Sequence, residues 1–232
     1  MAQRPRFGET YQHPVSQIFH RSSNTLARAS LLGALLLLAL GGWAWHEVYW
    51  SPYLTRVDLP RPQPVPFSHK HHVNGLGIDC RYCHVSVETS SYAGVPPTEV
   101  CMTCHSQLWT DAPLLAPVRE SLANNQRLRW ARVHDLPDFT FFDHSIHVNK
   151  GIGCQTCHGP VDQMPLVWQE HTLYMKWCLD CHRDPAQFVR PRSEVFNMEW
   201  QPPTNQLAQG SELVSRYHIN VTQLTDCSMC HR

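Results

Sequence analysis

The sequence carries no net charge and little glycine. Lysine and arginine together number 19, as do aspartate and glutamate, and the 11 glycines are outnumbered by 18 prolines. Balanced charge provides no basic surface of the kind that nucleic-acid-binding proteins use, so we expect no nucleic-acid partner. The excess of proline over glycine favours extended connections over repeated tight turns. Neither feature explains why 232 residues contain 10 cysteines and 16 histidines.

Long apolar runs are also scarce, apart from one near the N-terminus. Residues 26–45 read LARASLLGALLLLALGGWAW, about the length that a bilayer-spanning helix needs. Basic residues precede or begin this run and aromatic residues crowd its far end, which predicts a cytoplasmic N-terminus. The basic residues are Arg4, Arg6, Arg21 and Arg28, and the aromatic ones are Trp43, Trp45, Tyr49, Trp50 and Tyr53.

These features predict three regions. We expect a cytoplasmic segment over 1–25, an uncleaved transmembrane signal anchor over 26–50 in the lipid bilayer of the bacterial cytoplasmic membrane, and a periplasmic domain over 51–232. A cleavable signal peptide is the alternative, with small residues near Ala39 as a cleavage site. The long arginine-bearing region before the apolar run favours the anchor. Few apolar residues remain for the core of the outer domain, so something else must fill its interior.

All ten cysteines fall into five Cys-x-x-Cys-His motifs, and none is left over. In this form two thiols bond to the vinyl groups of a haem, and the adjacent histidine becomes the proximal ligand of the iron. The sequence therefore predicts five covalently bound haem c groups. We number the motifs along the chain as motif 1 (Cys80, Cys83, His84), motif 2 (Cys101, Cys104, His105), motif 3 (Cys154, Cys157, His158), motif 4 (Cys178, Cys181, His182) and motif 5 (Cys227, Cys230, His231).

Zinc sites and disulfides are the alternatives to haem. The intervals between motifs 1 and 2 and between motifs 3 and 4 would suit paired zinc ligands. Five pairs, however, cannot be matched two by two, and histidine follows every pair, which chance would give about once in a million. A disulfide within a Cys-x-x-Cys pair would close only a trivial loop.

Each haem iron also needs a sixth ligand or an open site, and this choice separates an electron carrier from a catalyst. The segment FSHKHHVN (67–74) before motif 1 is repeated as FDHSIHVN (142–149) before motif 3. Two residues three apart share one helix face but point in somewhat different directions. One histidine of each segment can therefore serve the local haem while the other reaches a neighbouring haem.

We call His69 and His72 the first doublet, and His144 and His147 the second doublet. The predicted distal ligands are His69, His72, His134, His144 and His147. The reserves are His171 and His218, together with Met175 as an alternative that we expect to pack against a porphyrin edge instead.

About 180 residues must serve five haems, so the porphyrins supply much of the apolar interior. We expect a multihaem cytochrome c fold, with mostly short α-helices and loops wrapped around the haems and one N-terminal transmembrane helix. Residues 106–133 are predicted to be partly helical after Pro117. Residues 183–210 contain four prolines and are predicted to be an extended crossing.

The string RVHDLPDFTFFDHSIHVNKGIGCQTCHGPVDQM (132–164), with MKWCLDCHRDP (175–185) after it and VPFSHKHH (65–72) before it, carries a family resemblance. It resembles the pentahaem cytochrome c subunit of alternative complex III, a bacterial quinol-oxidising complex. The resemblance implies a subunit that passes electrons from quinol oxidation in a respiratory or photosynthetic membrane to a downstream cytochrome c or copper protein. The partners it implies are an iron–sulfur/molybdopterin-enzyme-like subunit, polysulfide-reductase-type membrane subunits and a monohaem cytochrome c subunit.

On this interpretation the chain has no catalytic residues and is not itself an enzyme. The alternative is a self-contained quinol dehydrogenase of the NapC/NrfH type with an open haem site. The surplus of histidines argues against this alternative, because it suffices to give every iron a sixth ligand. A pentahaem reductase would need an open iron and an unusual motif such as Cys-x-x-Cys-Lys, and all five motifs end in histidine.

Overall fold

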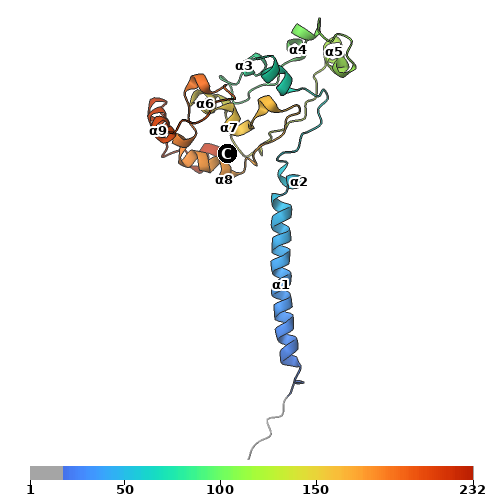
Figure 1. Cartoon of the computed structure of the whole chain (residues 1–232), viewed down its shortest axis with the longest axis vertical. Helices are drawn as coiled ribbons and strands as arrows, with labels where there is room; N and C mark the ends of the chain where they lie inside the picture. Colours follow the sequence, from blue (N-terminus) through green and yellow to red (C-terminus); the bar gives the residue numbers. More distant parts are fainter. Residues whose placement is uncertain (1–17, 232) are drawn as a thin grey trace, which may run out of the picture. The chain divides into compact units, whose positions relative to one another are not determined.

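The computed structural model describes residues 18–231 and divides the chain into two compact units on either side of the Ser51–Pro52 bond (Figure 1). The first unit holds helix α1, Ser23–Trp50, and the second holds the remaining elements described. Most of the predicted cytoplasmic segment, residues 1–17 with Arg4 and Arg6, lies outside the described residues, as does Arg232.

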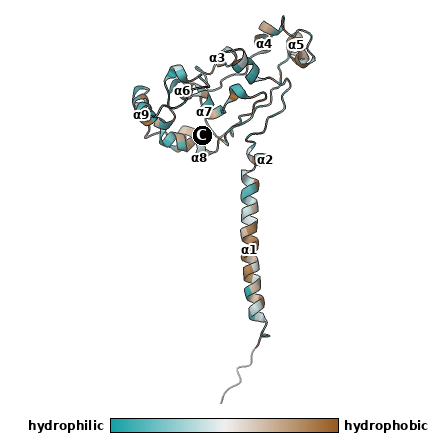
Figure 2. Ribbon diagram, viewed as in Figure 1, coloured by the Kyte–Doolittle hydropathy of each residue, from teal (hydrophilic) through white to brown (hydrophobic). Residues whose placement is uncertain are grey.

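Helix α1 is a candidate membrane span. Its 28 residues extend about 42 Å, more than the hydrocarbon core of about 30 Å. None of the helix is buried against other described residues, and apolar residues dominate its central turns (Figure 2). Near its end Trp45 stacks on Tyr49, with ring centroids 6.4 Å apart. Length and composition fit a membrane anchor, and a signal sequence near the N-terminus has the same properties.

The second unit consists of short helices joined by loops. Its α-helices are α2 Pro52–Thr55, α3 Cys80–Cys83, α4 Thr98–His105, α5 Ala116–Ala123, α6 His144–Asn149, α7 Cys154–His158, α8 Met175–Arg183, α9 Gln206–Arg216 and α10 Cys227–Cys230. The tighter or wider helical turns are η1 Lys70–Gly75, η2 Pro113–Leu115, η3 Val161–Gln163, η4 Pro185–Gln187 and η5 Arg192–Glu194. Among the described residues, β-pairing is limited to isolated bridges. The predicted architecture of short helices and loops is confirmed.

The connections between motifs agree with the sequence in part. Helix α5 begins at Ala116, next to the predicted start after Pro117. The predicted extended crossing over 183–210 contains the two short turns η4 and η5 and the first residues of α9. Helix α9 itself was not predicted. It packs its buried residues Gly210 and Leu213 toward η4 and the adjoining chain.

The apolar core is small for a unit of about 180 residues. One cluster of buried side chains joins Val87, Val148 and Val195. A second joins Val189, Leu213 and Tyr217. A protein of this length normally buries a much larger set of apolar side chains. The second unit therefore requires other apolar material in its interior, as the sequence predicts.

The contact between α9 and η4 gives a test of packing. A Cβ atom at Gly210 would overlap the carbonyl oxygen of Ala186. We expect Gly210→Ala to lower the free energy of unfolding by about 1–3 kcal/mol, because a backbone carbonyl cannot swing aside as a flexible side chain can. Gly75→Ala is the matched control, since its Cβ would lie 3.6 Å from the nearest atom. Thermal melts of the haem-loaded chain should separate the two variants, and equal melting temperatures would contradict this packing.

Candidate haem sites

Each Cys-x-x-Cys-His motif lies on a short helix or ends one. Motifs 1, 3 and 5 coincide with α3, α7 and α10, while motifs 2 and 4 form the C-terminal turns of α4 and α8. A helical turn brings residues three and four apart to one face, so both thiols and the histidine can approach one bound group. Asp79 caps α3 by accepting a 2.8 Å hydrogen bond from the Arg81 N–H. None of the ten cysteines, all of which lie within the described residues, forms a disulfide.

The two histidine doublets have nearly the same local geometry. The Phe67 ring lies 4.4 Å from that of His72 at 24°, and the Phe142 ring lies 4.6 Å from that of His147 at 26°. The earlier histidine of each doublet meets the same phenylalanine edge-on, at 4.9 Å for His69 and 4.8 Å for His144. The repeated segment thus fixes both histidines of a doublet against one aromatic ring. The sequence shows the repeat but did not assign this role to the phenylalanines.

Each doublet histidine faces the proximal histidine of a different motif. In the first doublet, His69 lies opposite His84 of motif 1 and His72 opposite His105 of motif 2, with ring centroids 6.5 and 6.3 Å apart. In the second doublet the corresponding partners belong to motifs 3 and 4. His144 lies 6.3 Å from His158, and His147 lies 6.1 Å from His182. Each doublet therefore connects two consecutive motifs.

These separations fit an iron between two imidazoles. A ring nitrogen lies about 2 Å from a metal ion that it binds, and the ring centre lies roughly 1 Å behind it, so two opposed ligands have ring centres about 6 Å apart. The four centroid distances lie between 6.1 and 6.5 Å. The donor set at motifs 1 to 4 thus suits a six-coordinate haem iron.

Backbone carbonyls orient several of these rings. The Nδ1 atoms of His72 and His147 lie 2.8 and 2.7 Å from the carbonyl oxygens of Ser68 and Asp143. Because a carbonyl only accepts, Nδ1 must donate, and this leaves the lone pair on Nε2 free for a metal. The same contact occurs at His84, His144 and His182, whose carbonyl partners are Gly94 at 2.7 Å, Ser91 at 2.9 Å and Leu224 at 2.9 Å.

Burial lowers the pKa of several candidate ligands. Desolvation, followed by repulsion from His84, lowers the pKa of His69 to about 4. Desolvation also lowers the pKa of His158 to about 3, with smaller contributions from neighbouring histidines. The pKa values of His72 and His147 shift in the same direction, mainly through burial. A neutral imidazole is the form that binds a metal.

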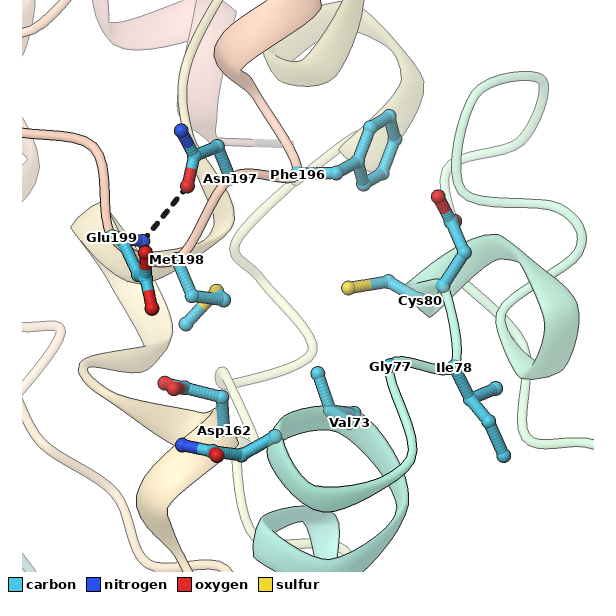
Figure 3. A pocket seen from close by; sticks show the side chains of 11 residues that line it. Val73, Gly77, Ile78, Cys80, Asp162, Phe196, Asn197, Met198 and Glu199 are labelled. Atoms are coloured by element: carbon cyan, nitrogen blue, oxygen red, sulfur yellow. Dashed lines mark hydrogen bonds between the residues drawn. The ribbon is translucent and has the colours of Figure 1, made fainter.

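A hollow beside motif 1 receives a cysteine side chain. A cavity of about 320 Å³ lies among η1, motif 1, η3 and residues 196–199. Figure 3 shows the Cys80 thiol pointing into this space, with Phe196 and Met198 on the other side. The cavity has a mixed lining of apolar side chains such as Val73 and Phe196 and polar ones such as Asp162, and the thiol at its edge is placed to form a thioether with a group bound there.

A protein-only metal site is not supported by the arrangement of side chains. Within residues 18–231, no group of three histidine, cysteine, aspartate or glutamate side chains converges so as to hold a metal ion. Zinc bound by protein alone needs four such ligands in structural sites and three in catalytic ones. The motifs therefore fit haem better than zinc.

His134, the fifth predicted distal ligand, lies next to motif 3. Its ring centroid is 4.3 Å from that of His158 at 77°, too close for two ligands on opposite sides of one iron, and His144 already faces His158. Desolvation lowers the pKa of His134 to about 4, and its Nε2 is buried without a hydrogen-bond partner. An unpaired nitrogen of this kind suits a metal ligand. That His134 binds the iron of the fifth haem stays a prediction.

Motif 5 and the reserve ligands show no opposed pair. The ring contact of His231 is with Phe139, at 5.9 Å and 30°. His171 stacks on Trp177 at 5.2 Å, and Met175 is 61% exposed. His218 has a positive φ of 53° on the loop after α9.

Two comparisons with known proteins agree with this geometry. A family model described as cytochrome c7 and related cytochrome c matches residues 140–232, which include motifs 3 to 5. The menaquinone reductase multihaem cytochrome c subunit of Nitratidesulfovibrio vulgaris is 30% identical over 206 residues, which cover 87% of this chain and 88% of that protein. The shared length, the covalent attachment motifs and the opposed histidines lead to one conclusion: this chain belongs to the multihaem cytochrome c family.

Proposed function

We propose that this chain is a pentahaem electron-transfer subunit of a membrane-bound complex that exchanges electrons with quinol. The observation that carries the proposal is the set of four opposed histidine pairs, which would occupy both axial positions of the irons at motifs 1 to 4. An iron with two protein ligands has no position left for a substrate. Bound c-type haem supplies one-electron redox chemistry.

The residues of the chain have three tasks in this function. The cysteines of each motif fix the haem edge, the paired histidines hold the iron from both sides, and the carbonyls of Ser68 and Asp143 keep two of those rings in place. Ligation by two histidines favours lower potentials than ligation by histidine and methionine. Such potentials suit exchange with a low-potential quinone such as menaquinone, which the name of the Nitratidesulfovibrio relative mentions.

The resemblance to alternative complex III supports a more specific proposal. In it, electrons leave quinol at polysulfide-reductase-type membrane subunits, and this chain passes them on to a cytochrome c or copper protein. The iron–sulfur/molybdopterin-enzyme-like subunit and the monohaem cytochrome c subunit complete the complex. The relative is named a menaquinone reductase, which corresponds to the opposite direction of flow. Purification of the tagged chain from membranes, followed by assays of quinol oxidation and quinone reduction, would identify the partners and the direction.

The purified, haem-loaded chain is expected to contain five haems, and those at motifs 1 to 4 are expected to be low-spin. A pyridine haemochrome assay against protein concentration measures the first quantity, and EPR spectroscopy with cyanide titration measures the second. Fewer than five haems would contradict attachment at every motif. High-spin haem amounting to more than one fifth of the total would contradict the electron-carrier proposal.

Motif 5 is the place where the second candidate function has support. His231 faces the Phe139 ring rather than a histidine. An open iron at this one site would give the chain a substrate position of its own, as in a self-contained quinol dehydrogenase. His134→Ala decides between the two: if His134 binds the fifth iron, the variant gains a high-spin signal that the unaltered protein lacks. If the unaltered protein already shows that signal, the fifth site is open.

A further inference from the structure

The order of the motifs in space differs from their order in the sequence. Motif 1 contacts motif 2 through the hydroxyls of Tyr82 and Thr103, which lie 2.9 Å apart inside the two attachment loops. The first doublet spans the same two motifs. Motifs 1 and 2 are therefore neighbours.

Motif 3 adjoins motif 1 on its other side. Cys154, the first cysteine of motif 3, packs against the apolar cluster that contains Val87, and Val87 lies three residues after motif 1. The Asn149 amide, at the end of α6, donates to the Glu88 carbonyl just after motif 1 at 2.8 Å. Motif 1 thus lies between motifs 2 and 3.

The line continues through motif 4 to motif 5. The second doublet spans motifs 3 and 4, since His144 lies 6.3 Å from His158 and His147 lies 6.1 Å from His182. On its other side, motif 4 contacts the segment that leads into motif 5. The Nδ1 atom of His182 donates to the carbonyl of Leu224, three residues before motif 5. Each of these contacts joins motif 4 to one neighbour.

Burial supports the same order. Motif 3 is enclosed, since Gly153 and Gly159 on either side of it are buried and each of its own residues is at least half-covered. Of the ten cysteines, all of which the structure describes, two are exposed: Cys104 of motif 2 and Cys227 of motif 5. A line of sites that crosses a small domain is expected to be most buried at its middle and most exposed at its ends.

We propose that the five attachment sites form one line in the spatial order 2–1–3–4–5, so that motifs 2 and 5 are its two terminal sites. This inference rests on haem attachment at all five motifs, as in the proposed function. Each step along the line would move one electron between adjacent sites, oxidising the first iron and reducing the second with no bond formed or broken. Motif 1 is then an interior site and motif 2 a terminal one, the reverse of the order along the chain.

The two histidines of the first doublet offer a matched test. His69→Met and His72→Met each replace the histidine opposite one proximal ligand, and methionine ligation raises the potential of that haem. In an EPR-monitored redox titration of the purified full chain, the altered haem is reduced first. The loss of its charge and spin then changes the signal of each haem beside it. A change of one unit charge is expected to alter the ratio of reduced to oxidised neighbour about tenfold, or 59 mV for one electron.

The proposed order predicts different counts for the two variants. His69→Met, at motif 1, should perturb two other haem signals, and His72→Met, at motif 2, should perturb one. If the sites followed the order of the sequence, His69→Met would perturb one other haem signal and His72→Met would perturb two. That result would overturn the proposal.

A measurement on the unaltered protein covers the case in which a methionine variant loses its haem. Iron positions from anomalous scattering, or from a cryo-EM map of the haem-loaded complex, should place the irons of motifs 2 and 3 nearest to that of motif 1. An iron at motif 2 that lies closer to motif 3 than to motif 1 would overturn the order. The irons could have the proposed order in a complex that exchanges no electrons with quinol. That outcome would contradict the proposed function but not the proposed order.

Discussion

Replacing His72 with alanine is expected to convert one of the five haems from low-spin to high-spin and to make that haem bind cyanide. The His72 ring faces His105 of motif 2 at 6.3 Å and is held in place by the Ser68 carbonyl and the stacked Phe67 ring. Alanine leaves one axial side of the iron without a protein ligand, while attachment through motif 2 is untouched. EPR spectra should show a new high-spin signal from one fifth of the haem.

The neighbouring His71 provides the matched control. It is exposed, and its ring meets that of His72 edge-on at 5.3 Å. His71→Ala should therefore leave the spin state of all five haems unchanged. Equal spectra for the two variants would show that His72 is not an iron ligand.

Removing the attachment site at motif 3 is expected to lower the haem content by more than one haem per chain and to prevent the domain from folding. Motif 3 is the most enclosed of the five, packs through Cys154 against Val87 next to motif 1, and is joined to motif 4 by the second doublet. The two apolar clusters, one around Val195 and the other around Val189, bury too little apolar area to stabilise the second unit without the haem at motif 3. The double variant Cys154→Ala, Cys157→Ala should therefore yield little protein with native Soret circular dichroism.

The same double change at motif 5 tests whether position matters. Cys227 is exposed, and the Leu224 carbonyl, just before motif 5, accepts a hydrogen bond from His182 of motif 4. Cys227→Ala with Cys230→Ala should remove one haem, keep four, and shift the melting temperature far less than the motif 3 variant does. Haem content by pyridine haemochrome and thermal melts measure both effects. A motif 3 variant that keeps four haems and a normal melt would show that the domain does not depend on its centre.

The sequence predicted the parts that depend on local pattern. The five motifs, the apolar helix and the repeated Phe-x-His-x-x-His segment are all visible in short windows, and the structure places both doublets opposite proximal histidines. Which histidine faces which motif could not be predicted, because it depends on how distant segments fold together. The carbonyl that accepts from His144 belongs to Ser91, 53 residues earlier, and the one that accepts from His182 lies 42 residues later.

His134 and α9 show the limits of the same reasoning. His134 has no repeated partner in the sequence, so nothing in its local pattern indicated that it would lie beside His158. Helix α9 buries two positions, Gly210 and Leu213, of which glycine is a poor helix former. Its contact with η4 stabilises it, and tertiary packing of this kind is not readable from propensity.

The doublets also have a consequence for thermal motion. His69 and His72 lie within one short segment and both pack against the Phe67 ring, so a fluctuation of the surrounding loops moves them together. The two irons that they would hold then keep a nearly constant separation while the rest of the domain fluctuates. Tunnelling rates fall steeply with distance, so the rate of transfer within each pair of sites should vary little between molecules and with temperature. Variation should instead arise at the junctions between pairs, where no single segment holds both sites.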